Sequence, residues 1–145
     1  MSSALPNIQG TATQDRPEKS GIALTKAGGT YAVPVRINNS ITLNFVVDSG
    51  AADVTIPADV VMTLMRLNTI TDADFLGNKA YRLADDSTVP SATFRIRSLK
   101  VGDIEIANVT GSVANVQGSL LLGQSFLSRF KTWSIDNRRY ILSLE

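Results

Sequence analysis

The chain has 145 residues, which suits one domain whose core removes roughly two-thirds of the unfolded surface from water. Apolar residues make up 43% and charged residues 19%, and the net charge is +1 without a face rich in Lys and Arg, so no nucleic-acid partner is expected. The chain contains no histidine and no cysteine. This excludes cysteine nucleophiles, disulfides, Cys/His zinc sites and every mechanism that needs an imidazole base.

The first segment, residues 1–20, contains Pro6, Gly10 and Pro17 among several Ser, Thr and Gln residues, and we expect it to be a flexible lead-in. It lacks the basic start and the apolar stretch of a signal peptide. No apolar run approaches the roughly 20 residues of a membrane span, so no membrane contact is evident in this chain. Residues 21–145 form the one predicted domain.

The domain begins with residues that alternate with a period of two. Residues 21–26 and 30–37 predict two strands joined by a turn at residues 27–29, and residues 38–40 predict a second turn. Residues 41–47 predict a strand with Ile41, Leu43, Phe45 and Val47 on one face. This strand leads from the core directly to Asp48, so we expect the carboxylate of Asp48 to be poorly solvated.

Two short helices are predicted next. Pro57 is suited to the first turn of a helix over residues 58–67, with Val60, Val61, Leu64 and Leu67 as its apolar stripe. Thr71 is suited to cap a second helix that ends before Gly77. Neither helix carries residues that suggest chemistry.

From residue 79 the pattern predicts strands again. Residues 80–84 and 88–96 are separated by a polar turn at 85–87, and strands over 99–101, 104–109 and 111–116 follow. The apolar run 120–122 ends at Gly123, residues 124–130 predict a short helix, and residues 132–135 and 140–144 predict a last hairpin in which Trp133 faces Tyr140. The fold class is therefore mainly β, with one or two short helices in a single closed domain.

Two motifs stand out: Val46-Val47-Asp48-Ser49-Gly50-Ala51, and further along the chain Leu121-Leu122-Gly123. An isolated Asp-Ser-Gly is equally typical of an ordinary Asx turn. Together with the apolar strand before it and the Leu-Leu-Gly after it, the pattern resembles aspartic proteases of the retropepsin type, in particular bacterial single-domain members. The resemblance implies a closed, barrel-like retropepsin (acid protease) fold over most of residues 21–144.

By this resemblance, Asp48 is the catalytic carboxylate and needs no metal and no cofactor. Two such carboxylates close together share one proton, so that one activates a water for attack on a peptide carbonyl while the other polarises that carbonyl. Ser49 would lock the turn across a dimer axis, Gly50 would allow a close approach, and Ala51 would leave room for substrate. Leu121 and Leu122 would pack behind the turn, and Gly123 would allow the chain to cross it closely.

The chain holds a single Asp-Ser-Gly motif, so the resemblance implies a homodimer in which Asp48 meets its symmetry mate. The substrate would be an extended peptide covered by a flap over residues 84–88, which are Ala84, Asp85, Asp86, Ser87 and Thr88. Asp53 would lie near the cleft, where it could shape a subsite or be a solvated turn residue.

Viral members of the family carry an acidic residue and an arginine that pair with each other at the positions of Ala52 and Gln124, so both charges are absent here. The predicted function is hydrolysis of peptide bonds by an aspartic endopeptidase. The alternative is a silent retropepsin-fold module for dimerisation or peptide binding, and a glycosidase with two carboxylates ranks last. Bacterial relatives are often periplasmic or anchored to a membrane, and the resemblance implies that either location could apply to the full-length protein.

Overall fold

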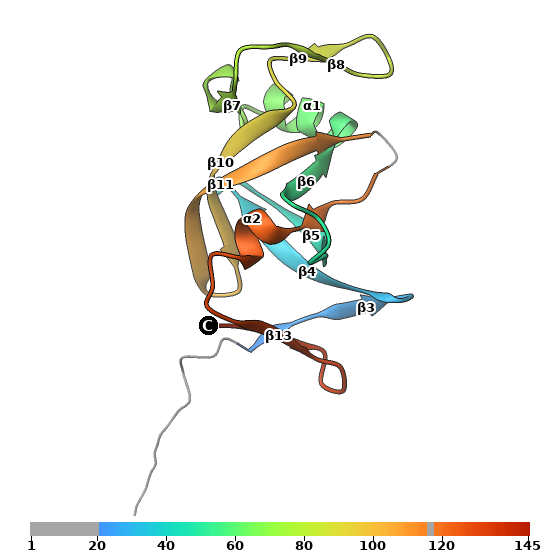
Figure 1. Cartoon of the computed structure of the whole chain (residues 1–145), viewed down its shortest axis with the longest axis vertical. Coiled ribbons are helices and arrows are strands. Elements are labelled where there is room, and N and C mark those ends of the chain that lie inside the picture. Colours follow the sequence, from blue (N-terminus) through green and yellow to red (C-terminus); the bar gives the residue numbers. More distant parts are fainter. Residues whose placement is uncertain (1–20, 116–117) are drawn as a thin grey trace, which may run out of the picture.

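The computed structural model describes residues 21–115 and 118–145, and strands make up about half of this part of the chain. The predicted lead-in over residues 1–20 and the predicted strand end at Val116 lie outside the described residues. Figure 1 shows the strands crossing in the centre of the molecule, with a separate hairpin at one end and a small sheet at the other.

Six strands form a closed barrel, because the sheet order runs from β4 to β10 and β4 also pairs with β10. In barrel order they are β4 (Thr30–Ile37), β5 (Ile41–Val47), β12 (Leu121–Leu122), β6 (Val54–Pro57), β11 (Ile104–Ala114) and β10 (Thr93–Val101). Two short strands extend this sheet, β3 (Thr25–Ala27) on β4 and β7 (Phe75–Leu76) on β10. The predicted mainly β, closed barrel is confirmed.

The hairpin between β4 and β5 follows directly from its turn residues. Asn38 and Asn39 have φ values of 50° and 56°, a region that asparagine tolerates better than most residues and that tight hairpin turns require. The resulting register places Val35 opposite Leu43 and Val33 opposite Phe45. The apolar side of β5 is therefore aligned with the buried side of β4.

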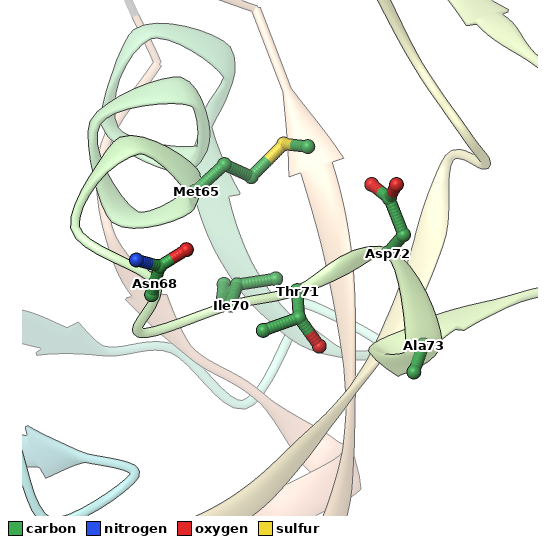
Figure 2. Close-up of a pocket in the computed structure, with 6 residues that line it drawn as sticks. All are labelled: Met65, Asn68, Ile70, Thr71, Asp72 and Ala73. Carbon is green, nitrogen blue, oxygen red and sulfur yellow. The ribbon is translucent and has the colours of Figure 1, made fainter.

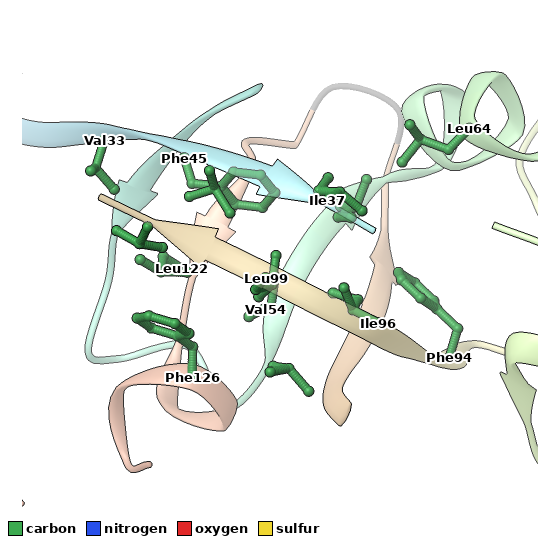
Figure 3. Close-up of a cluster of buried hydrophobic side chains, with 14 of the residues drawn as sticks. Val33, Ile37, Phe45, Val54, Leu64, Phe94, Ile96, Leu99, Leu122 and Phe126 are labelled. Carbon is green, nitrogen blue, oxygen red and sulfur yellow. The ribbon is translucent and has the colours of Figure 1, made fainter. Parts of the chain in front are cut away.

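The core lies inside the barrel and is built from alternate residues of the strands. Val33, Val35 and Ile37 of β4 are fully buried, as are Phe94 and Ile96 of β10. Figure 3 shows that Phe45 from β5, Leu122 from β12 and Phe126 from the helix after β12 belong to the same cluster. This packing supports the end of β5, where Asp48 follows.

The helices are shorter than predicted. In α1 (Ala58–Arg66) Val61 and Leu64 are buried as expected, but Leu67 is the residue that ends the helix and its surface is 57% exposed, so it does not belong to the apolar stripe. The second helix is a single 3-10 turn, η1 (Asp72–Asp74). The third, α2 (Gln124–Leu127), ends before residue 130, because the chain turns so that the Lys131 N–H can donate to Glu145 O.

Several predicted strand boundaries are wrong. The strand expected over residues 21–26 is divided into β2 and β3, and the separate strand expected over residues 99–101 is the end of β10. The strand expected over residues 88–96 is interrupted after β9 (Thr88–Val89), since Pro90 has no N–H to continue a ladder, and β9 pairs with β8 (Tyr81–Arg82) as a separate hairpin. The strands expected over 104–109 and 111–116 are instead one strand, β11. Asn108 takes a positive φ of 59° within it, yet the register with β10 continues past this residue.

The two ends of the described chain meet in a small sheet of β13 (Trp133–Asp136), β14 (Ile141–Leu144) and β2 (Ile22–Ala23). Trp133 is opposite Leu144, so the predicted pairing of Trp133 with Tyr140 is wrong. Asp136 accepts hydrogen bonds from the N–H groups of Arg138 and Arg139, and the longer turn that results leaves Tyr140 outside β14 with φ 57°. The Tyr140 ring lies against Tyr31, with 6.0 Å between the ring centres.

Candidate active site

The two sequence motifs lie side by side in the barrel. β5 and β12 pair in parallel, with Val46 opposite Leu121 and Val47 opposite Leu122. The N–H of Asp48 donates to the carbonyl of Leu122 over 3.2 Å, which extends this pairing by one residue. Asp48 is thus fixed where the chain leaves the sheet, and its side chain is half-buried.

The turn that follows is closed by its own hydrogen bonds. The Gly50 N–H donates to Asp48 Oδ1 at 2.9 Å, and the Ala51 N–H donates to the Asp48 carbonyl at 3.2 Å. The geometry is that of an Asx turn. An Asx turn and the turn expected of a retropepsin motif are therefore compatible with each other at Asp48. Because Ser49 and Gly50 are exposed, the Asp48 carboxylate is anchored through one oxygen at an accessible edge of the barrel.

Gly123 lies where the chain crosses closely behind the turn. A Cβ at this position would be 2.3 Å from the carbonyl oxygen of Asp53 and 2.6 Å from that of Ala51, and both are backbone atoms. Immediately after Gly123, the Gln124 N–H donates to Ala51 O at 2.8 Å and the Ser125 N–H donates to Ala52 O at 2.9 Å. Leu122 is fully buried beneath this crossing.

Gln124 also bonds the turn through its side chain. Its Nε2 donates to the carbonyl oxygen of Ser49 at 2.9 Å. Ala52, which stands where viral members have an acidic residue, is exposed. The side-chain contact made by Gln124 was not predicted, although its position directly after Leu-Leu-Gly was the available signal.

Two serines that the sequence did not single out stabilise the surroundings of the turn. Ser125 Oγ accepts from the Val54 N–H at 2.8 Å and donates to Thr110 O at 2.6 Å, which links β6 to β11 through α2. Ser112 Oγ donates to Asp53 Oδ2, and Asp53 is half-buried. Ser112 carries no sequence signal, because only the parallel pairing of β11 with β6 brings it near Asp53.

The predicted flap forms the hairpin of β8 and β9. Its tip is closed by hydrogen bonds from Leu83 N–H to Ser87 O and from Asp86 N–H to Leu83 O, with Asp86 at φ 68°. The Ser87 hydroxyl and N–H both donate to the Asp85 carboxylate, and these bonds lower the pKa of Asp85. Asp86, at a positive φ, and Asp85, which accepts both bonds from Ser87, therefore close the tip of the hairpin.

The structure brings the two motifs together but places the flap tip elsewhere. Asp85 and Ser87 line a hollow of about 440 Å³ with residues of α1 and with Leu43. Leu83 and Ala84 line a second hollow of about 460 Å³ with Ala58, Ala114 and Asn115. Figure 1 shows the hairpin beyond α1, away from the end of β5.

A further pocket, of about 380 Å³, lies between the end of α1 and η1. Figure 2 shows its lining, which consists of Met65, Asn68, Ile70, Thr71, Asp72 and Ala73. None of these is a predicted site residue. Within residues 21–115 and 118–145, no group of three or more acidic, His or Cys side chains could hold a metal ion, and no helix is long and apolar enough to cross a membrane.

Comparisons with known proteins agree with this geometry. The family described as "gag-polyprotein putative aspartyl protease" matches residues 33–129, which is more than half of the chain. No curated protein matches the sequence.

Two solved structures show the same fold. A retropepsin-like aspartic protease from Rickettsia conorii is 26% identical with a TM-score of 0.57, over 87% of this chain and 89% of that one. The retroviral protease-like domain of Ddi1 from Leishmania major is 18% identical with a TM-score of 0.54, over 83% of this chain and 89% of that one, and supports the fold alone. The chain belongs to the gag-polyprotein aspartyl protease family and has the retropepsin-like fold.

Proposed function

We propose that the chain is an aspartic endopeptidase that acts as a homodimer, with Asp48 of each subunit in one active site. The observation that carries the proposal is the position of Asp48. It follows a core strand, is half-buried, and has one carboxylate oxygen held by the Gly50 N–H in an otherwise exposed turn. A second copy of this turn facing the first would complete a pair of carboxylates.

Such a pair accounts for catalysis without histidine or cysteine. Two carboxylates at close range cannot both ionise easily, so one keeps a proton. The ionised one takes a proton from water, which attacks the peptide carbonyl, while the protonated one donates to the carbonyl oxygen. The tetrahedral intermediate then breaks its C–N bond as the amine receives the proton that the first carboxylate took from water, and the second carboxylate recovers its proton from a hydroxyl of the intermediate, which restores the pair. The ionised carboxylate and the protonated carboxylate would each be supplied by the Asp48 of one subunit.

The contact between subunits would involve the exposed turn residues Ser49, Gly50 and Ala52, and the small terminal sheet. In the terminal sheet, both edges of β14 are paired within the chain, to β13 and to β2. A sheet continued across the dimer would therefore use β13 or β2, which are its outer strands. The flap residues Ala84–Thr88, whose hairpin lies beyond α1 and away from the end of β5, would have to move toward Asp48 to close over an extended peptide. Asp53 would face one of the peptide's side chains.

The proposal is tested with an unstructured protein substrate such as casein. We expect cleavage, and we expect Asp48→Asn to reduce it by at least about a thousandfold, because a general base is lost. Asp103→Asn is the matched control, since Asp103 is an exposed residue in the turn between β10 and β11. Equal loss in both variants, or full activity of Asp48→Asn, would contradict the role of Asp48.

The dimer is tested by mixing wild type with inactive Asp48→Asn chains in equal amounts under conditions that exchange subunits. Random pairing leaves about a quarter of the dimers with two intact carboxylates, whereas independent monomers would leave about half of the activity. Sedimentation at micromolar concentration measures the association directly. Full activity of a strict monomer would refute the paired mechanism.

A further inference from the structure

Gln124 and Ala52 occupy the positions at which viral members of the family carry a charged pair. We infer that Gln124 is a positioning residue that orients the Asp48 carboxylate through the peptide between Ser49 and Gly50, using an uncharged hydrogen bond within the same chain. This inference rests on the proposed function, in which Asp48 is the catalytic carboxylate.

The contact runs through a single peptide group. Gln124 Nε2 donates to the carbonyl oxygen of Ser49 at 2.9 Å, and the N–H of the same peptide, which belongs to Gly50, donates to Asp48 Oδ1 at 2.9 Å. The peptide is planar, so its C=O and N–H cannot turn independently. Holding the carbonyl of Ser49 therefore holds the donor that orients the Asp48 carboxylate.

The two hydrogen bonds also reinforce each other. A peptide carbonyl that accepts a hydrogen bond makes its own N–H a better donor, because the group is polarised along the chain of bonds. Gly50 has no side chain to restrict its torsions and lies in an exposed turn, so this peptide depends more on hydrogen bonding for its orientation than one between bulkier residues would. Without Gln124, rotation of the peptide would remove the N–H from Asp48.

Gln124 is itself held firmly enough to act in this way. It is the first residue of α2, and its own N–H donates to Ala51 O at 2.8 Å. Phe126 and Leu127, which follow it in α2, are fully buried in the core. The side-chain amide therefore projects from a fixed base toward the turn.

The chemistry of the contact distinguishes it from an ion pair. An amide does not titrate, so the hydrogen bond to Ser49 O persists at the acidic pH at which a carboxylate dyad works, where an acidic partner would become protonated. It also needs no residue of the second subunit. Each chain would therefore orient its own Asp48 before it meets a partner.

Three variants of the full chain test the inference. Gln124→Leu keeps much of the side-chain size and removes the donor. Gln124→Glu keeps the shape but places a carboxylate against the Ser49 carbonyl, and only its protonated form can donate. Ser128→Ala is the matched control, because it removes a hydroxyl that donates to Gln124 O at the end of α2 and makes no contact with the Asp48 turn.

We expect Gln124→Leu to lower kcat for peptide cleavage about tenfold with KM within about twofold, and Ser128→Ala to change neither by more than about twofold. The activity of Gln124→Glu relative to wild type should rise as the pH falls through the range near 4.3 where a glutamate becomes protonated. A ratio that stays flat with pH would overturn the inference, since a purely structural loss does not depend on protonation of residue 124.

Amide hydrogen exchange gives a readout that does not depend on activity. Gln124→Leu should speed exchange of the Gly50 N–H in the folded protein, while Ser128→Ala leaves it unchanged. Unchanged Gly50 exchange in Gln124→Leu would overturn the positioning role even if kcat falls. If wild type cleaves nothing, the proposed function fails, and the exchange measurement still decides whether Gln124 holds the peptide; if Gln124→Leu does not fold, Gln124→Glu compared at low and neutral pH gives the same decision.

Discussion

Replacing Gly123 with alanine tests how closely the chain crosses behind the Asp48 turn. The backbone of Gly123 has φ −97° and ψ −164°, an extended conformation that alanine adopts without strain. The added methyl group would nevertheless lie 2.3 Å from Asp53 O and 2.6 Å from Ala51 O. Any loss of stability in Gly123→Ala therefore comes from steric overlap of the new methyl group with these oxygens, and not from backbone strain.

The size of this cost can be worked out from what must move. Both obstructing atoms are backbone oxygens, so the turn and β12 have to separate, and overpacking of this kind costs about 1 to 3 kcal/mol. The movement also weakens the hydrogen bonds from Gln124 N–H to Ala51 O and from Ser125 N–H to Ala52 O, at about 1 kcal/mol each. We expect Gly123→Ala to lose about 3 to 5 kcal/mol of the free energy of unfolding.

The assay is urea unfolding followed by tryptophan fluorescence, with Tm measured in parallel at one fixed protein concentration. A loss of this size lowers Tm by about 10 °C or more in a domain of this length. Gly29→Ala is the control, because Gly29 lies in an exposed turn without a positive φ and a Cβ there would meet no atom within 4 Å. It should be neutral or slightly stabilising.

The result that would refute this reasoning is a Gly123→Ala variant within about 0.5 kcal/mol of wild type. The chain would then cross more loosely than the two short distances require. The hydrogen bonds from Gln124 and Ser125 to the turn would then not depend on a glycine at this position. A similar loss in Gly29→Ala would instead show that alanine destabilises these turns for reasons other than space.

Three other substitutions test side-chain contacts, the first beside the Asp48 turn and the other two elsewhere in the domain. Ser125→Ala leaves the Val54 N–H and Thr110 O without their partner and should cost about 2 kcal/mol in urea unfolding, whereas Ser134→Ala on an exposed strand position should cost little. Asp74→Asn removes the charge that buried Asp74 presents to Arg97 Nε at 3.1 Å and should cost about 1 to 2 kcal/mol, with Asp103→Asn as the neutral control. Ser87→Ala should raise the pKa of Asp85 toward its ordinary value of 3.8, followed by NMR titration of the carboxyl carbon. The pKa of Asp85 is lower in the folded protein than in the unfolded chain, so ionised Asp85 stabilises the flap hairpin above pH 3.8, and this stabilisation is lost as the pH falls through the folded pKa. An unchanged pKa of Asp85 in Ser87→Ala would contradict the role of Ser87.

Local patterns predicted the strands of the barrel well because each strand has one buried face. The alternation in residues 30–37 and 41–47 corresponds to β4 and β5 with matching bounds, and the asparagines between them predicted the turn. Boundaries were wrong where one residue overrides the pattern. Pro90 breaks a predicted strand, and the turn around Asp136 moves Tyr140 out of the last hairpin.

The candidate site depends on contacts that no local pattern contains. β12 has only two residues, and periodicity cannot show that it lies between β5 and β6. The family resemblance predicted that Leu121-Leu122-Gly123 lies behind the Asp48 turn, and the parallel pairing of Leu121 with Val46 agrees with this. The distances at Gly123 and the contact of Ser112 with Asp53 follow only from the closed barrel.

The proposed enzyme would be assembled in two steps: the Asp48 turn is ordered within each chain, and two chains then associate. The bond from the Asp48 N–H to the Leu122 carbonyl, the bond from the Gly50 N–H to the Asp48 carboxylate, and the Gln124 amide behind them all lie within a single subunit. A half-site organised in this way loses little conformational entropy when two copies meet, because the groups that must be ordered are ordered already. Mutations at Gln124 should then change kcat without changing the dissociation constant of the dimer, while mutations on the outer edge of the terminal sheet should change that constant without changing the kcat of the dimers that form.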